Sequence, residues 1–151
     1  MKDRPTLPDF DLGRFTPYRL AVAAEKTSEE LARQYHARFG ISIPEWRVLV
    51  HLAQPIDGAE TVSVRDIEAR VAMEKSKVSR AAKRLEASGH IEKAREAGDR
   101  RLVRLALTDR GRALMSDILP LAIAYQAEIE ARLGDAFAEL DAGLEALLDR
   151  D

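Results

Sequence analysis

The sequence predicts a mainly α-helical protein with one small β-hairpin, an α+β fold. Through most of the chain, apolar residues recur every three to four positions, as on the buried side of an amphipathic helix. Between residues 91 and 107 this period shortens towards two, which is typical of strands. Hydrophobic residues make up 46% of the 151 positions, so a packed core is feasible.

The first expected helix spans about residues 17–38. Residues 1–15 contain Pro and Asp and are expected to be extended or poorly ordered. Thr16 and Pro17 form a helix start, with Thr as the N-cap and Pro at the first helical position. Gly40 is expected to end this helix.

Two shorter helices follow, and each begins after a serine. Ser42 stands three residues before Glu45, the spacing of a capping box, and opens a helix that runs to about Ala53. Ser63 has the same spacing to an acidic residue and opens a helix to about Val71. We expect both serines to be structural caps only.

A strongly basic helix is expected next, over about residues 75–88. Residues 75–84 carry five positive charges and no negative one, although the chain as a whole has a net charge of −2. Val78, Ala82 and Leu85 recur at i, i+4 and i+7 and are expected to face the core. A short turn joins this helix to the preceding one, which is the helix-turn-helix pattern.

The two expected strands, residues 91–95 and 102–107, enclose turn-forming residues and a charged tip, Gly-Asp-Arg-Arg, at 98–101. A basic helix followed by a basic hairpin tip is the arrangement with which a winged helix-turn-helix grips DNA. We therefore expect residues 41–108 to form a winged helix-turn-helix DNA-binding domain.

Further helices are expected after Thr108, with a break at Gly134. Like the first helix, they carry more apolar surface than a small winged helix can cover. Such faces are most simply buried against a second copy of the chain. We expect residues 16–40 and 109–151 to form a helical dimerisation region, and the protein to be a homodimer.

Charge is distributed unevenly along the chain. Residues 65–112 contain 14 basic and 8 acidic residues, whereas the rest contains 10 basic and 18 acidic ones. The middle third is therefore suited to a polyanionic partner such as double-stranded DNA.

Other classes of function find little support. Without cysteine there is no disulfide, thiol nucleophile or cysteine-ligated metal. The sequence also lacks a phosphate-cradling Gly-rich loop, a His-x-x-x-His pair and a nucleophile–base set. We expect no enzyme activity, cofactor or metal. No apolar run is long enough to span a membrane, and no signal peptide is evident, so we expect a cytoplasmic protein.

The order of elements and two motifs resemble the MarR family of transcriptional regulators. The first motif comprises Lys-Ser-Lys-Val-Ser-Arg (75–80), Arg-Leu-Glu (84–86) and Gly-His-Ile (89–91), and resembles the family's recognition helix and its exit. The second, in residues 99–111, resembles the wing signature Asp-x-Arg…Leu-Thr-x-x-Gly. The resemblance covers about residues 15–150. It implies a homodimer, in most cases a repressor, whose two winged helices face successive major grooves of a pseudo-palindromic operator.

The resemblance also implies roles for individual residues. In the recognition helix, Ser76, Lys77 and Arg80 are expected nearest the bases, and a bidentate contact of Arg80 with guanine is worth roughly 1–3 kcal/mol of discrimination. Contacts nearer the phosphates are expected from Lys75, Ser79, Lys83 and Arg84.

The wing is expected to add contacts from Arg100 and Arg101. Arg101 resembles the wing-tip arginine that enters the minor groove, where the negative potential is concentrated. Asp99 is expected to pair with Arg101 and to set its direction, although a merely solvated ion pair at this turn stays an alternative.

MarR-like dimers often hold a small aromatic or phenolic anion between the dimer helices and the DNA-binding lobe. By analogy, the ligand-binding residues are expected to be Tyr35, Trp46, Arg47 and His51. Trp46 would stack on the ligand, and Arg47 and His51 would meet its charge, but a tryptophan in this position is more often a core residue of an amphipathic helix. The lack of cysteine excludes the thiol-based peroxide sensors of the family. A winged-helix module that binds an acidic protein, without sequence-specific DNA binding, is the alternative function.

Replacing Asp99 by Ala tests whether this residue directs Arg101 at the tip of the wing. The variant should bind DNA more weakly, even though it loses a negative charge, because Arg101 is no longer directed into the groove. Titration of labelled DNA measures this change, and tighter binding would contradict the positioning role.

Overall fold

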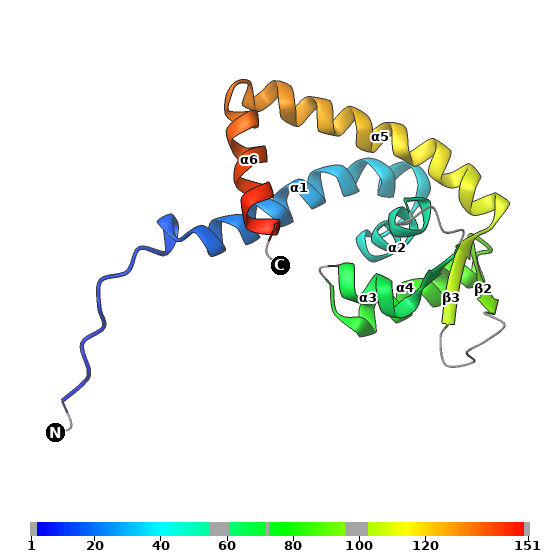
Figure 1. Cartoon of the computed structure of the whole chain (residues 1–151), viewed down its shortest axis with the longest axis horizontal. Helices are drawn as coiled ribbons and strands as arrows, with labels where there is room; N and C mark the ends of the chain where they lie inside the picture. The colour runs from blue at the N-terminus through cyan, green and yellow to red at the C-terminus, as the bar shows by residue number, and fades with distance from the viewer. Residues whose placement is uncertain (1–2, 55–60, 72, 96–102, 150–151) are drawn as a thin grey trace.

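The computed structural model describes residues 3–54, 61–71, 73–95 and 103–149 (Figure 1). Within them the chain is mainly helical, with a small antiparallel sheet, which confirms the predicted fold class. The elements in chain order are η1 (Leu12–Arg14), α1 (Thr16–Phe39), α2 (Ile43–Ala53), β1 (Val62–Ser63), α3 (Val64–Arg70), α4 (Lys75–Ala87), β2 (Ile91–Arg95), β3 (Val103–Leu107), α5 (Asp109–Leu133) and α6 (Ala136–Leu148).

The caps and breaks read from the sequence set most helix boundaries. Ser42 Oγ accepts a hydrogen bond of 3.3 Å from the backbone N–H of Glu45 and so caps α2. Ser63 and Thr108 cap α3 and α5 in the same way. Gly40 ends α1 with a left-handed φ of 66°. One prediction is wrong in detail: α1 begins at Thr16 itself, and Phe15, which has no side-chain acceptor, occupies the N-cap position.

The three strands form a sheet in the order β1-β3-β2, with both pairs antiparallel. Ile91 pairs with Leu107 and Arg95 with Val103, so β2 and β3 form the expected hairpin. β1 pairs with the other edge of β3, where Val62 lies opposite Leu105. The sheet therefore joins the start of the helix-turn-helix to its wing.

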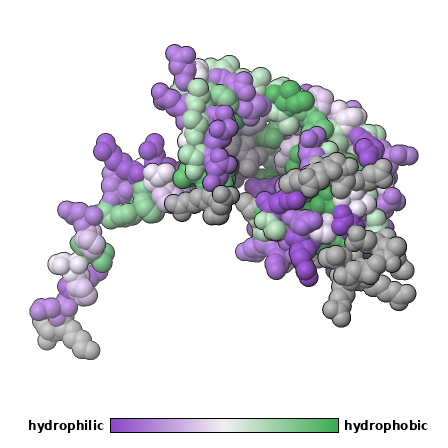
Figure 2. Space-filling model, viewed as in Figure 1, coloured by the Kyte–Doolittle hydropathy of each residue, from purple (hydrophilic) through white to green (hydrophobic). Residues whose placement is uncertain are grey.

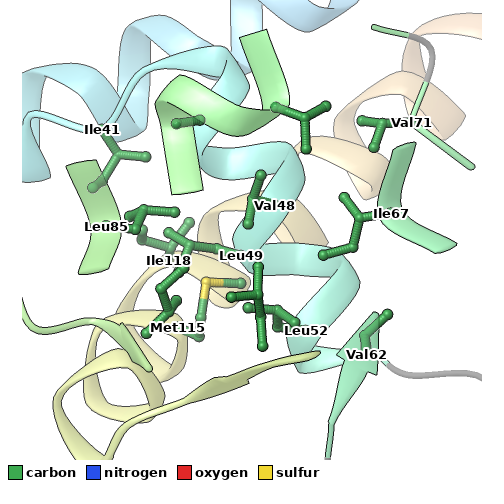
Figure 3. Close-up of a cluster of buried hydrophobic side chains, with 14 of the residues drawn as sticks. Ile41, Val48, Leu49, Leu52, Val62, Ile67, Val71, Leu85, Met115 and Ile118 are labelled. Carbon is green, nitrogen blue, oxygen red and sulfur yellow. The ribbon is translucent and has the colours of Figure 1, made fainter. Parts of the chain in front are cut away.

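One hydrophobic core joins the helix-turn-helix, the sheet and parts of both long helices (Figure 3). From α4 it takes Val78, Ala81 and Leu85, each fully buried. The sequence predicts Ala82 in place of Ala81; Ala82 is partly buried beside the same cluster. Both alanines lie on the inward side of the helix, because positions i+3 and i+4 are neighbours there.

The long helices are shared between this core and the expected dimerisation region. Tyr35 of α1 and Ile118 of α5 belong to the core, so these helices do not form a separate unit. Beyond it, α6 folds back from the end of α5 and contains no buried residue (Figure 1). Figure 2 shows hydrophobic residues exposed along the N-terminal segment and α6. The large exposed apolar residues of the N-terminal segment, the start of α1 and α6 include Leu7, Phe10, Phe15, Tyr18, Val22, Leu140, Leu144, Leu147 and Leu148.

Gly111, in the first turn of α5, offers a sharp test of this packing. A Cβ atom added there would lie 2.0 Å from the carbonyl oxygen of His90. We expect Gly111→Ala to lower the free energy of unfolding by about 1–3 kcal/mol, the usual cost of overpacking. The matched control is Gly143→Ala in α6, where a Cβ would meet nothing within 4 Å; it should raise stability by about 0.5–1 kcal/mol. Urea denaturation measures both changes, and equal effects would contradict the packing described.

Candidate nucleic-acid interface

α4 presents one continuous polar face to solvent. The residues expected to contact DNA are all exposed on this helix: Lys75, Ser76, Lys77, Ser79, Arg80, Lys83 and Arg84. The buried side of α4, formed by Val78, Ala81 and Leu85, is called its apolar seam below. Because successive residues of a helix are rotated by about 100°, the side of α4 opposite this seam carries Ser76, Arg80 and Lys83. These three side chains therefore point most directly away from the protein, whereas Lys77 and Arg84 lie on one flank.

The first turn of α4 is positive for two reasons. It contains Lys75 and Lys77 and no acidic residue. As in any α-helix, its backbone N–H groups point toward the N-terminal end, and the side chain of the N-cap residue, Glu74, accepts no hydrogen bond from them. A helix end of this kind attracts phosphate groups.

The hairpin connects to α4 through Gly89, whose φ is 79°. The expected tip residues Asp99, Arg100 and Arg101 lie outside the described residues, so their roles stay predictions. Near the end of the described strands, where Arg104 pairs with Ala94, Arg104 donates hydrogen bonds to Thr61, from Nε to Oγ1 at 2.6 Å and from Nη2 to the carbonyl oxygen at 3.0 Å. This anchor could not be predicted from the sequence, since nothing local links two residues 43 positions apart.

A pocket of about 310 Å³ lies where α1, α2 and α5 meet. Three of the four expected ligand-binding residues, Tyr35, Trp46 and Arg47, are in its lining. The fourth, His51, is not; its Nδ1 lies 2.6 Å from the carbonyl oxygen of Arg47, within α2. The other lining residues are Thr27, Ser28, Leu31, Ile43, Ala122, Tyr125, Gln126 and Ile129.

One wall of the pocket is aromatic. The rings of Tyr35 and Trp46 stack with centroids 5.4 Å apart and an interplanar angle of 27°. Burial raises the pKa of Tyr35 to about 12, against a smaller opposing effect of Arg47. The phenol therefore stays neutral near pH 7, and Arg47 supplies positive charge to the same lining. Trp46 also packs against the core, the alternative role expected from the sequence.

Tyr125 forms part of the opposite wall and was not predicted from the sequence. Its hydroxyl donates a hydrogen bond of 2.6 Å to Glu30 Oε2 on α1, and Arg132 Nη1 lies 3.3 Å from the same oxygen. Burial, and then the bond to Glu30, raise the pKa of Tyr125 to about 12. The hydrogen bond from Tyr125 is also the main reason why the pKa of Glu30 is lowered. This cluster ties α1 to α5 beside the pocket.

Two kinds of feature are absent from the described part of the chain. It contains no group of three or more His, Asp or Glu side chains that could hold a metal ion. None of its helices is both long enough and apolar enough to cross a membrane.

The helix-turn-helix, its basic second helix and the following hairpin define a winged helix-turn-helix protein. Residues 39–102 match the sequence model of the MarR family. The chain belongs to the MarR family of transcriptional regulators.

Relatives agree with this assignment. The chain is 34% identical over 107 residues to the HTH-type transcriptional regulator TtmR of Methylorubrum extorquens (strain PA1). That match covers 68% of this chain and 53% of TtmR, so the chain spans about half the length of this curated relative. A MarR family regulator from Silicibacter pomeroyi DSS-3 has a similar fold, with a TM-score of 0.78, 29% identity and coverage of 93% of this chain and 98% of its own. A MarR/EmrR family regulator from Acinetobacter sp. ADP1 is also similar in fold, with a TM-score of 0.78 and 26% sequence identity. The match covers 91% of this chain and 95% of the Acinetobacter protein.

Tyr125→Phe tests the bond between α1 and α5. The pKa of Glu30 is lower in the folded protein than its ordinary value of 4.5. The ionised carboxylate of Glu30 therefore stabilises the folded protein fully above pH 4.5. This stabilisation is lost as the pH falls through the pKa that Glu30 has in the folded state. We expect Tyr125→Phe to be less stable than the parent protein at pH 7, with a difference that shrinks below pH 4.5.

Urea denaturation at a series of pH values measures this difference. Tyr18→Phe is the matched control, because Tyr18 is exposed and has no hydrogen-bond partner among the described residues. A difference between Tyr125→Phe and the parent protein that stays constant from pH 7 to pH 3.5 would rule out a charge-assisted bond to Glu30.

Proposed function

We propose that this protein binds double-stranded DNA sequence-specifically through α4 and represses transcription. The observation that carries the proposal is the division of α4 into two faces. One is fully buried through Val78, Ala81 and Leu85, and the other exposes Ser76, Arg80 and Lys83. An α-helix fits the major groove of B-DNA, where such side chains meet base edges and phosphates.

The active form is a homodimer. The exposed apolar side chains of the N-terminal segment, α1 and α6 support this, because a second copy would remove them from water. A two-fold symmetric dimer presents two α4 helices, and these would read half-sites about 10 bp apart in a pseudo-palindromic operator.

The pocket is the site of a small aromatic or phenolic effector. The stacked rings of Tyr35 and Trp46 suit a planar ligand, and Arg47 suits a carboxylate or phenolate. α2 carries Trp46 and Arg47, and it also packs on α4. Ligand binding would release DNA by changing the spacing of the two recognition helices.

Selection of bound fragments from genomic DNA, followed by footprinting, tests the proposal. We expect one pseudo-palindromic sequence to be enriched, and affinity to fall steeply as salt is raised, because each neutralised phosphate releases counterions. Equal affinity for every sequence would instead favour a winged-helix module that binds an acidic protein.

Arg80→Ala should relax specificity at one base pair of each half-site. Removing a bidentate interaction with guanine costs roughly 1–3 kcal/mol of discrimination. A repeat of the selection with the variant measures the base preference at every position. Lys26→Ala, on α1, is the control and should leave the selected sequence unchanged. A variant at Arg80 that selects the same operator with the same stringency would contradict the role of this residue.

A further inference from the structure

Arg84 differs from the other positive residues of α4. Its Nε lies 3.6 Å from Glu45 Oε1 at the start of α2. The other four basic side chains of the run, Lys75, Lys77, Arg80 and Lys83, have no ion-pair partner in the part of the chain that the structure describes. Of the five positive side chains in this run, Arg84 thus already forms an ion pair within the protein.

Glu45 is well placed to hold the guanidinium group of Arg84 in one position. The carboxylate lies in the first turn of α2, with only 15% of the side chain exposed, and accepts a hydrogen bond of 2.7 Å from the hydroxyl of Ser42. That hydroxyl also caps α2, so the carboxylate is fixed on one side by the helix start. On the other side it reaches across to the C-terminal half of α4.

We propose that Glu45 is a positioning residue for DNA recognition, acting through Arg84. The pair fixes the rotation and tilt of α4 on α2, so that Ser76 and Arg80 are directed at base edges. Arg84 thereby serves as a clamp, rather than as the phosphate contact expected from the sequence. The inference rests on the proposed binding of DNA by α4.

The apolar seam alone does not supply this constraint. The buried side chains of Val78, Ala81 and Leu85 select the inward face of α4, but their apolar contacts are non-directional and define its exact rotation and tilt less sharply than a directed polar contact does. An ion pair between two helices depends on the positions of both groups and resists such rocking. Because half of the Arg84 side chain is exposed, the pair adds little to overall stability. Its effect falls on orientation.

A double-mutant cycle tests the clamp. Glu45→Gln removes the charge but keeps an oxygen that can accept the bond from Ser42, and Arg84→Gln removes the cation. The affinity of each single variant and of the double variant is measured for the selected operator and for random duplex DNA, over a series of salt concentrations. Lys83→Gln is the matched control, because Lys83 is exposed on the same helix and has no ion-pair partner among the described residues.

We expect each single variant to weaken operator binding about three- to fivefold, since a half-exposed ion pair contributes at most about 1 kcal/mol, and to change binding to random DNA less than about twofold. The double variant should be no weaker than either single one, and the salt dependence should stay as in the parent protein. Lys83→Gln should weaken binding to both DNAs alike and reduce the salt slope by about 0.9 for each phosphate that the variant no longer neutralises. The operator-to-random ratio separates orientation from stability, since partial unfolding lowers both affinities equally.

Additive effects of Glu45→Gln and Arg84→Gln would overturn the clamp. So would a fall in the salt slope with Arg84→Gln, or tighter operator binding with Glu45→Gln, because either result makes Arg84 a phosphate contact that Glu45 opposes. If Arg80→Ala and Lys83→Gln also leave DNA binding unchanged, the proposed function fails along with the clamp. If those two variants behave as expected and only the cycle is additive, the clamp alone is wrong.

Discussion

The burial of Val78, Ala81 and Leu85 determines which way α4 faces, and the whole candidate DNA-binding surface depends on it. Fully burying one Val or Leu side chain stabilises a fold by about 1.5–3 kcal/mol. Turning α4 over would expose this seam and would bury Arg80 and Lys83, whose unpaired charges cost still more to remove from water. Against energies of this size, the small contribution of a half-exposed ion pair cannot decide which face of α4 is buried. The seam therefore selects the face that meets solvent, and finer contacts such as Glu45–Arg84 adjust it.

α2 is the element through which the two candidate sites meet. Ile43, Trp46 and Arg47 line the pocket, whereas Val48, Leu49 and Leu52 are buried in the core that also holds the seam of α4 (Figure 3). The helix is only three turns long, so its two faces cannot move independently. A ligand that shifts Trp46 or Arg47 would shift the surface on which α4 rests. Glu30, Tyr125 and Arg132 tie α1 to α5 beside the same pocket, and Tyr125 is in its lining.

Features set by neighbours in the chain could be predicted from the sequence. The caps at Ser42, Ser63 and Thr108, the stop at Gly40 and the hairpin of β2 and β3 each depend on a few adjacent residues, and all are present. Ala81 and Ala82 could not be told apart, because both lie on the inward side of α4 and neither has a bulky side chain to decide the matter. Pairings across the fold were missed. The partners of Arg104, Tyr125 and Arg84 lie 39 or more positions away, and a charge pattern shows that a side chain is polar without showing what it meets.

Methylation interference on the selected operator tests the central claim, that the outer face of α4 reads the major groove, most directly. Methyl groups on guanine N7 project into that groove. We predict that they block binding in two half-sites whose centres lie about 10 bp apart, one for each α4 helix of the proposed dimer. Undiminished binding to fully methylated DNA, with interference only from modified phosphates, would contradict this claim.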